Sequence, residues 1–253
     1  MKDEATVQND ENSADRTIGE FVAEDYRTAA VFEQHGIDFC CGGKVTLSEA
    51  CREKGIDLEM MLGEMDSARS TPLDRDRNYA AWDLSFLADY IVNIHHSYLN
   101  ENLGQITGYT HKVAQVHGAK HPEVIEISSV FAKIATDMPL HLHEEEGVLF
   151  PTIKKIEAAG KAGATPDAKD LETINVSLEK LIREHDEIGE AVHTIRHLAN
   201  DYTLPSYACT TYMLSYQKLK EFEDDLHKHV HLENNILFPK AAQFKGNTLC
   251  SRR

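Results

Sequence analysis

The most informative feature of this chain is the sequence HLHEEEGVLFP at residues 141–151, because it returns as HVHLENNILFP at residues 229–239. Both copies read His-x-His-x-Glu-x-x-(Val or Ile)-Leu-Phe-Pro. A further histidine lies at nearly the same distance upstream of each copy, His96 before the first and His185 before the second. A repeated motif whose upstream partner is also repeated indicates two related halves of one structure.

The spacing within each copy places an imidazole and a carboxylate on one helix face. Residues i and i+4 of an α-helix lie one above the other on the same side. His141 therefore shares a face with Glu145, and His229 shares a face with Glu233. Each copy offers one nitrogen donor and one oxygen donor in a single direction.

Four helices that direct four imidazoles and two carboxylates at a common axis can hold two metal ions, bridged by both carboxylates. An added oxo or hydroxo bridge brings each ion to about five ligands and leaves a position for a small molecule. A nitrogen-rich set without thiolate favours iron over magnesium or a structural zinc site, while zinc and manganese remain alternatives. The predicted ligands are His96, His141, Glu145, His185, His229 and Glu233.

The other histidines are predicted to be surface groups. His143 and His231 belong to the opposite register of the repeat and have no carboxylate four residues further on. They point away from the first set, and we expect them to be exposed; the alternative is that they support the ligands or handle protons near the mouth of the site. The same expectation covers His95, His111, His117, His121, His193, His197 and His227.

Apolar residues recur with a spacing near 3.6 in four long segments, and strand-like alternation is not seen. Short polar connections between the segments indicate an up-down-up-down four-helix bundle, hence an all-α protein. Pro139 should either kink the second helix and aim His141, or mark a point where that helix restarts. The predicted helices cover residues 83–116, 123–158, 171–199 and 207–244.

A smaller helical module precedes the bundle. Two capping boxes, Thr17 to Glu20 and Thr46 to Glu49, predict helix starts, with stops at Gly36 and near Gly55. A third helix is predicted over residues 58–65, followed by a polar stretch over residues 67–78. The predicted organisation is a tail over 1–15, a small domain over 16–70, a linker over 71–80 and the bundle over 81–245.

Composition limits the classes of partner. A formal charge of −16 disfavours nucleic acid and anionic membrane surfaces. The apolar runs are too short for a membrane helix. The first 15 residues lack the features of a secretory signal, so we expect a cytoplasmic protein. Five cysteines, an odd number, then indicate reduced thiols rather than a disulfide framework.

Two of these thiols are adjacent, in the sequence Cys40-Cys41-Gly-Gly. Neighbouring cysteines do not easily form an unstrained disulfide. Redox exchange with a partner thiol, handling of a metal or cluster, and burial as small apolar side chains remain as alternatives. The two glycines that follow allow the backbone to bend sharply beside the thiols.

The whole combination resembles the repair-of-iron-centres family. The likeness rests on DFCCGG at residues 38–43, EHDE at 184–187 and LENNILFP at 232–239, and it covers nearly all of the chain after about residue 16. The resemblance implies a hemerythrin-like bundle with two irons and a role in restoring iron-sulfur clusters damaged by nitric oxide or hydrogen peroxide. It implies terminal ligands at His96, His141, His185 and His229, bridging carboxylates at Glu145 and Glu233, and paired cysteines at Cys40 and Cys41.

Several functions are compatible with these residues. Repair could proceed by lending iron to a damaged cluster or by removing nitric oxide, which would make the protein an enzyme of the nitric oxide reductase type. The alternative is a carrier or sensor that binds oxygen or nitric oxide reversibly. A third interpretation is a scaffold that stores metal and associates with partners, or with itself as a homodimer, through the N-terminal module. The expected partners are damaged iron-sulfur proteins and small gases or peroxide.

Overall fold

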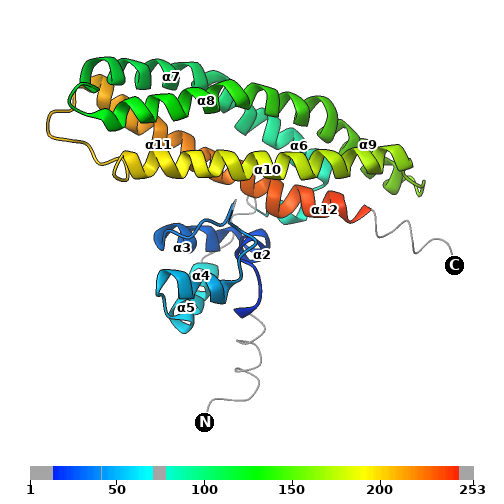
Figure 1. Ribbon diagram of the computed structural model, residues 1–253. Coiled ribbons are helices and arrows are strands. Elements are labelled where there is room, and N and C mark those ends of the chain that lie inside the picture. The colour runs from blue at the N-terminus through cyan, green and yellow to red at the C-terminus, as the bar shows by residue number, and fades with distance from the viewer. Residues whose placement is uncertain (1–13, 41, 71–77, 245–253) are drawn as a thin grey trace, which may run out of the picture. The chain divides into compact units, whose positions relative to one another are not determined.

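The computed structural model describes residues 14–40, 42–70 and 78–244, and these divide into two compact units (Figure 1). The first unit takes the described residues up to Asp83 together with Val230–Lys240. The second takes Leu84–His229 together with the described residues from Ala241. The predicted tail over residues 1–15 lies almost wholly outside the described residues, as does most of the predicted linker.

Residues 84–242 form four long helical rods, as predicted, and three of the four consist of consecutive helical segments. Where the structure describes the chain, no strand is present, and Thr17 and Thr46 form an isolated antiparallel bridge. The all-α class is confirmed. The rods are α6 (Leu84–Ile91), η4 (Val92–His96) and α7 (Ser97–His117); α8 (Pro122–Glu144), η5 (Glu145–Leu149) and α9 (Phe150–Lys161); α10 (Ala168–Leu198); and α11 (Thr210–His231), η6 (Leu232–Leu237) and α12 (Phe238–Ala242).

Apolar packing holds the rods of the second unit together. α7 packs against α8, α8 packs against α10, and Figure 1 shows α7, α8, α10 and α11 running alongside one another. Phe131 of α8 and Phe222 of α11 are fully buried and pack edge to face, with ring centroids 5.2 Å apart. Their burial follows from the apolar stripe that each helix directs inward. The four-helix bundle is thereby confirmed.

π-helical segments interrupt three of the rods at the predicted metal ligands. η4 ends at His96, η5 begins at Glu145, and Glu233 is the second residue of η6. A π-helix inserts an extra residue into the i to i+4 repeat, and such insertions concentrate at functional sites. The periodicity of the sequence gave no sign of them, because one inserted residue hardly disturbs a pattern averaged over a long helix.

Pro139 does not divide the second rod. α8 runs without a break from Pro122 to Glu144, with Pro139 inside it. The interpretation in which the helix restarts at Pro139 is therefore wrong. The packing of α8 against its neighbours offsets the backbone hydrogen bond that proline removes.

Glu157 of α9 caps the start of the first rod. Its carboxylate accepts hydrogen bonds from the backbone N–H groups of Leu84 at 2.8 Å and Ser85 at 3.0 Å, and another from the Ser85 hydroxyl. Burial opposes the charged form, but the hydrogen bonds from Ser85 and Leu84 outweigh it and hold the pKa of Glu157 below its ordinary value of 4.5. The carboxylate thus supplies acceptors to amides that a helix start leaves unsatisfied.

We expect Glu157→Gln to lower the free energy of unfolding by about 1–2 kcal/mol at neutral pH. Since the folded pKa lies below the unfolded one, the stabilisation is complete above the ordinary value of 4.5 and is lost as pH falls through the folded pKa. Urea unfolding at neutral pH and in acid should show the difference from wild type shrinking in acid. Glu126→Gln, at an exposed site of α8, is the control, and a pH-independent difference would contradict this account.

The first unit contains the small helical module. Both predicted capping boxes form, at Thr17 with Glu20 and at Thr46 with Glu49, because each threonine accepts from the backbone and each glutamate returns the bond. Gly36 and Gly55 adopt positive φ at the predicted stops. The elements are α2 (Ile18–Glu24), η1 (Tyr26–Thr28), α3 (Ala29–Gln34), α4 (Leu47–Lys54), α5 (Leu58–Ser70) and η3 (Tyr79–Ala81).

The third helix of this module is longer than predicted. α5 continues to Ser70, whereas the prediction ended it at residue 65 and assigned 67–70 to a polar linker. Met61 and Met65 are fully buried and anchor the helix. The residues that follow, 66–70, are mostly polar, and none of them is a glycine or proline that would end a helix. Polarity alone therefore did not end the helix.

Candidate metal centre

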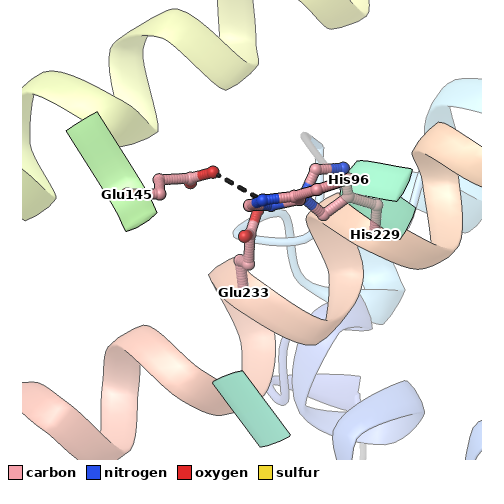
Figure 2. Close-up of side chains that lie close together, drawn as sticks. All are labelled: His96, Glu145, His229 and Glu233. Atoms are coloured by element: carbon pink, nitrogen blue, oxygen red, sulfur yellow. Dashed lines mark hydrogen bonds and ion pairs between the residues drawn. The ribbon is translucent and has the colours of Figure 1, made fainter. Parts of the chain in front are cut away.

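The six predicted ligands are buried and converge within the bundle, and none of them is more than 5% exposed. They come from four different rods, and three of them, His96, Glu145 and Glu233, lie in the π-helical segments η4, η5 and η6. Their ligand atoms fall into two groups, each within a span of 4.8 Å: His96, Glu145, His229 and Glu233 in one, and His141, Glu145 and His185 in the other. Figure 2 shows Glu145 reaching from its helix toward the side chains of the first group.

Glu145 belongs to both groups, and its two oxygens face different histidines. Oε2 lies 3.4 Å from Nε2 of His96, whereas Oε1 lies 3.4 Å from Nε2 of His141 and 3.7 Å from Nε2 of His185. One oxygen directed at each group is the arrangement of a carboxylate that bridges two cations. Glu233 follows His229 by one turn of a continuous helix, and it joins the first group only.

The histidines face one another in two pairs. Nε2 of His96 lies 3.2 Å from Nε2 of His229, and Nε2 of His185 lies 3.0 Å from Nε2 of His141. Two such nitrogens have at most one hydrogen bond between them, whereas neutral imidazoles offer a lone pair each to a cation placed near both. Burial of two carboxylates also favours a compensating positive charge. The donor set therefore fits metal ions.

Two further carboxylates contact the Nδ1 atoms of His96 and His141, on the side of each ring away from the paired Nε2 atoms. Nδ1 of His96 lies 2.7 Å from Oε1 of Glu146, and Nδ1 of His141 lies 2.9 Å from Oε2 of Glu184. A carboxylate on Nδ1 fixes the tautomer and turns Nε2 inward, which is the usual support of a metal-bound histidine. Sequence reasoning missed both residues, although each is adjacent to a predicted ligand, Glu146 to Glu145 and Glu184 to His185.

We expect Glu184→Ala to weaken metal binding about 10- to 100-fold, because His141 loses the acceptor that orients its ring. Chelator competition on the metal-loaded protein measures the change. Glu184→Gln keeps an oxygen acceptor and should restore part of the affinity. Glu187→Ala, at an exposed site of the same helix, is the control, and equal metal loss from both alanine variants would contradict the assigned role.

His95 is buried, which contradicts the prediction that it lies at the surface. It is 4% exposed, its Nδ1 lies 2.9 Å from Oδ1 of Asp225, and its ring stacks on that of His229 at 5.6 Å and 3°. The cause is the π-helical segment η4, in which the inserted residue brings both His95 and His96 to the inner side.

His231 is also buried, and its predicted exposure is wrong. It is 0% exposed, and its ring packs against those of Tyr26 and Phe39 in the first unit. Burial lowers the pKa of His231 to about 3, so the ring stays neutral. Its counterpart in the first copy, His143, is exposed as predicted.

The remaining predicted surface histidines are exposed or partly exposed, as expected: His111, His117, His121, His193, His197 and His227. Neither metal-type group among the described residues contains a cysteine. Cys40 is a buried thiol whose Sγ donates to Oδ1 of Asp38 at 3.1 Å, and Cys41 lies outside the described residues. In the part of the chain that the structure describes, no helix is long and apolar enough to span a bilayer.

Both parts of the chain are similar to known protein families. Residues 14–69 match the ScdA N-terminal domain, a domain of unknown function, and residues 87–241 match the hemerythrin HHE cation-binding domain. The iron-sulfur cluster repair protein ScdA of Staphylococcus epidermidis is 32% identical over 223 residues, 87% of this chain and 96% of that protein.

Two relatives from other bacteria are equally similar. The iron-sulfur cluster repair protein YtfE of Cronobacter sakazakii is 33% identical over 227 residues, and that of Escherichia coli O8 is 32% identical over the same length. Each alignment covers 90% of this chain and 96% of the relative. With a buried histidine and glutamate cluster inside a hemerythrin-like bundle, the chain belongs to the family of iron-sulfur cluster repair proteins.

Proposed function

We propose that this protein repairs iron-sulfur clusters through two non-haem iron ions held in the bundle. The observation that carries the proposal is the placement of Glu145, whose two oxygens face two separate histidine pairs. His96 and His229 would bind one iron, and His141 and His185 the other, with Glu145 bridging them and Glu233 adding its carboxylate from one turn beyond His229. An oxo or hydroxo bridge would complete the pair.

The protein contributes to this chemistry by fixing the positions of the six ligand side chains and by excluding water from them. When bound, the iron pair supplies exchangeable positions and redox electrons to a small molecule or a damaged cluster. Glu146 and Glu184 orient the His96 and His141 rings through Nδ1. Burial of the six ligands strengthens every electrostatic contact among them, because the local dielectric is low.

The targets we propose are iron-sulfur proteins whose clusters nitric oxide or peroxide has damaged. Two routes serve this repair, namely donation of iron to the damaged cluster and removal of nitric oxide. Donation needs a labile iron, whereas nitric oxide removal needs both irons to stay in place. Iron content before and after incubation with a damaged cluster protein separates the two, since unchanged content excludes donation.

Metal analysis with Mössbauer spectroscopy on iron-grown protein tests the centre itself. We expect about two irons per chain with the signature of an exchange-coupled pair. A single iron per chain, or two uncoupled ions, would contradict the bridged arrangement. Stable and reversible oxygen binding by the reduced protein would instead favour a carrier or sensor. A cytoplasmic location and self-association through the N-terminal module stay predictions.

A further inference from the structure

The second copy of the repeat departs from the first directly after its carboxylate. Asn234 and Asn235 stand where Glu146 and Gly147 stand in the first copy. Both asparagines lie in η6, immediately after Glu233, and both are only partly exposed. Glu146 contacts Nδ1 of His96, whereas the asparagines form hydrogen bonds with a different part of the chain.

The side chains of these asparagines hold the backbone that carries the first cysteine. Nδ2 of Asn235 donates to the carbonyl oxygen of Phe39 at 2.9 Å, and Nδ2 of Asn234 donates to that of Cys40 at 3.3 Å. Asn235 also donates to Nδ1 of the buried His231 at 3.0 Å. All of these residues belong to the first unit, in which Val230–Lys240 packs with the small helical module.

Two glycines leave the space that Asn235 fills. A Cβ on Gly19 would lie 2.4 Å from Oδ1 of Asn235, and a Cβ on Gly43 would lie 3.1 Å from the same atom and 2.5 Å from the carbonyl oxygen of Phe39. The backbone N–H of Gly19 donates to the carbonyl oxygen of Gly43 at 2.8 Å. The second glycine of the Cys-Cys-Gly-Gly sequence is therefore explained first by its close approach to the Phe39 carbonyl, the group that Asn235 holds, and then by its approach to Asn235 itself.

The thiol of Cys40 is buried next to the two carbonyl groups that the asparagines hold. Cys40 is 3% exposed, and Oδ1 of Asp38 accepts both its backbone N–H at 2.9 Å and its thiol at 3.1 Å. The described residues on either side of Cys40 are outside any helix, and the two amides of η6 add hydrogen bonds to this stretch at Phe39 and Cys40. Release of the two carbonyls would open the thiol to solvent.

We propose that Asn234 and Asn235 are positioning residues that link metal binding through Glu233 to the accessibility of the Cys40 thiol. The inference rests on the proposed function, since Glu233 must be a metal ligand. A metal ion that fixes Glu233 also fixes η6, and η6 presents the two amides to the Cys40 segment. Linkage is reciprocal, so a closed Cys40 segment also favours the η6 conformation that binds metal.

Alkylation of Cys40 in the full chain tests the link. Iodoacetamide labelling of the apoprotein and of the iron-loaded protein, with tandem mass spectrometry to separate Cys40 from Cys41, gives the rate in each state. In wild type we expect iron to slow labelling by about 5- to 100-fold, the usual range for coupled sites. In Asn235→Ala, labelling should be fast in both states and the effect of iron should disappear.

The control is Asn102→Ala. Asn102 donates its side-chain amide to the Tyr98 carbonyl within α7, and its loss should leave the effect of iron intact. Asn235→Asp keeps the size of the side chain and removes the amide donor, and it replaces the alanine variant if that variant does not fold. Hydrogen exchange of the peptide over residues 37–44 in wild type, with and without iron, gives a second readout that needs no substitution.

The outcomes separate the two proposals. Equal labelling and equal exchange of wild type with and without bound iron would overturn the link and leave the metal centre standing. Failure of the chain to bind iron would overturn the proposed function and the link with it. Persistence of the iron effect in both Asn235 variants would overturn the role of the amide.

Discussion

Glu145→Gln is expected to abolish the metal pair. The variant keeps the shape of the side chain but replaces one carboxylate oxygen by an amide nitrogen, which has no lone pair for a cation. Because one oxygen of Glu145 faces each group of ligands, an amide with a single oxygen can no longer bridge the two ions, and the negative charge that both ions share is also lost. We expect iron to fall from about two per chain to well below one, with affinity reduced by at least ~100-fold.

Iron analysis and chelator competition measure this loss, and cluster repair activity should disappear with it. His143→Ala is the matched control, because His143 lies on the same helix two residues before Glu145 and is exposed. Retention of both irons by the glutamine variant would show that Glu145 is no bridge. Loss of one iron only would assign it to a single ion.

Phe131→Ala is expected to have the largest effect on stability. The ring is fully buried in α8 and meets Phe222 of α11 edge to face at 5.2 Å, so its removal leaves a cavity between two rods. Such truncations cost about 3–5 kcal/mol, part of it from the lost aromatic pair. Urea unfolding of the apoprotein, followed by far-ultraviolet circular dichroism, measures the change without the stabilisation that bound metal adds.

Leu140→Ala is the control for this prediction. Leu140 lies on the same helix, is 73% exposed, and should change stability by no more than about 0.5 kcal/mol. A small effect at Phe131 would mean that the bundle closes around the cavity. Iron binding by the folded variant should survive, since Phe131 lies more than two helical turns before His141.

Much of the fold was predictable because its signals are local. The capping boxes at Thr17 and Thr46 form as the sequence indicates, since each depends on residues only three apart. The four rods follow from apolar spacing sustained over many turns. α5 ran past its predicted end because nothing in the sequence near Met65 forbids a helix. The π-helical segments have no local signal at all, and His95 was misassigned for that reason.

The site was predictable in its donors and less so in their surroundings. The repeat selects Glu145 because spacing on a helix fixes which residues share a face. Glu146 and Glu184 act across helices, and a sequence shows which helices are neighbours only indirectly. His231 was expected at the surface because the amphipathic pattern assigns only one inner face, whereas this helix also packs against Tyr26 and Phe39.

The four long helices and the convergence of the six predicted ligands follow from the sequence, because they depend on periodicity and on spacing within one element. Which histidines lie next to one another does not follow from the sequence. His96 of the first half lies with His229 of the second, and His141 lies with His185, so each pair joins the two copies of the repeat. Packing among four rods sets that choice, since spacing along a helix fixes the direction of a side chain but not the neighbour it meets.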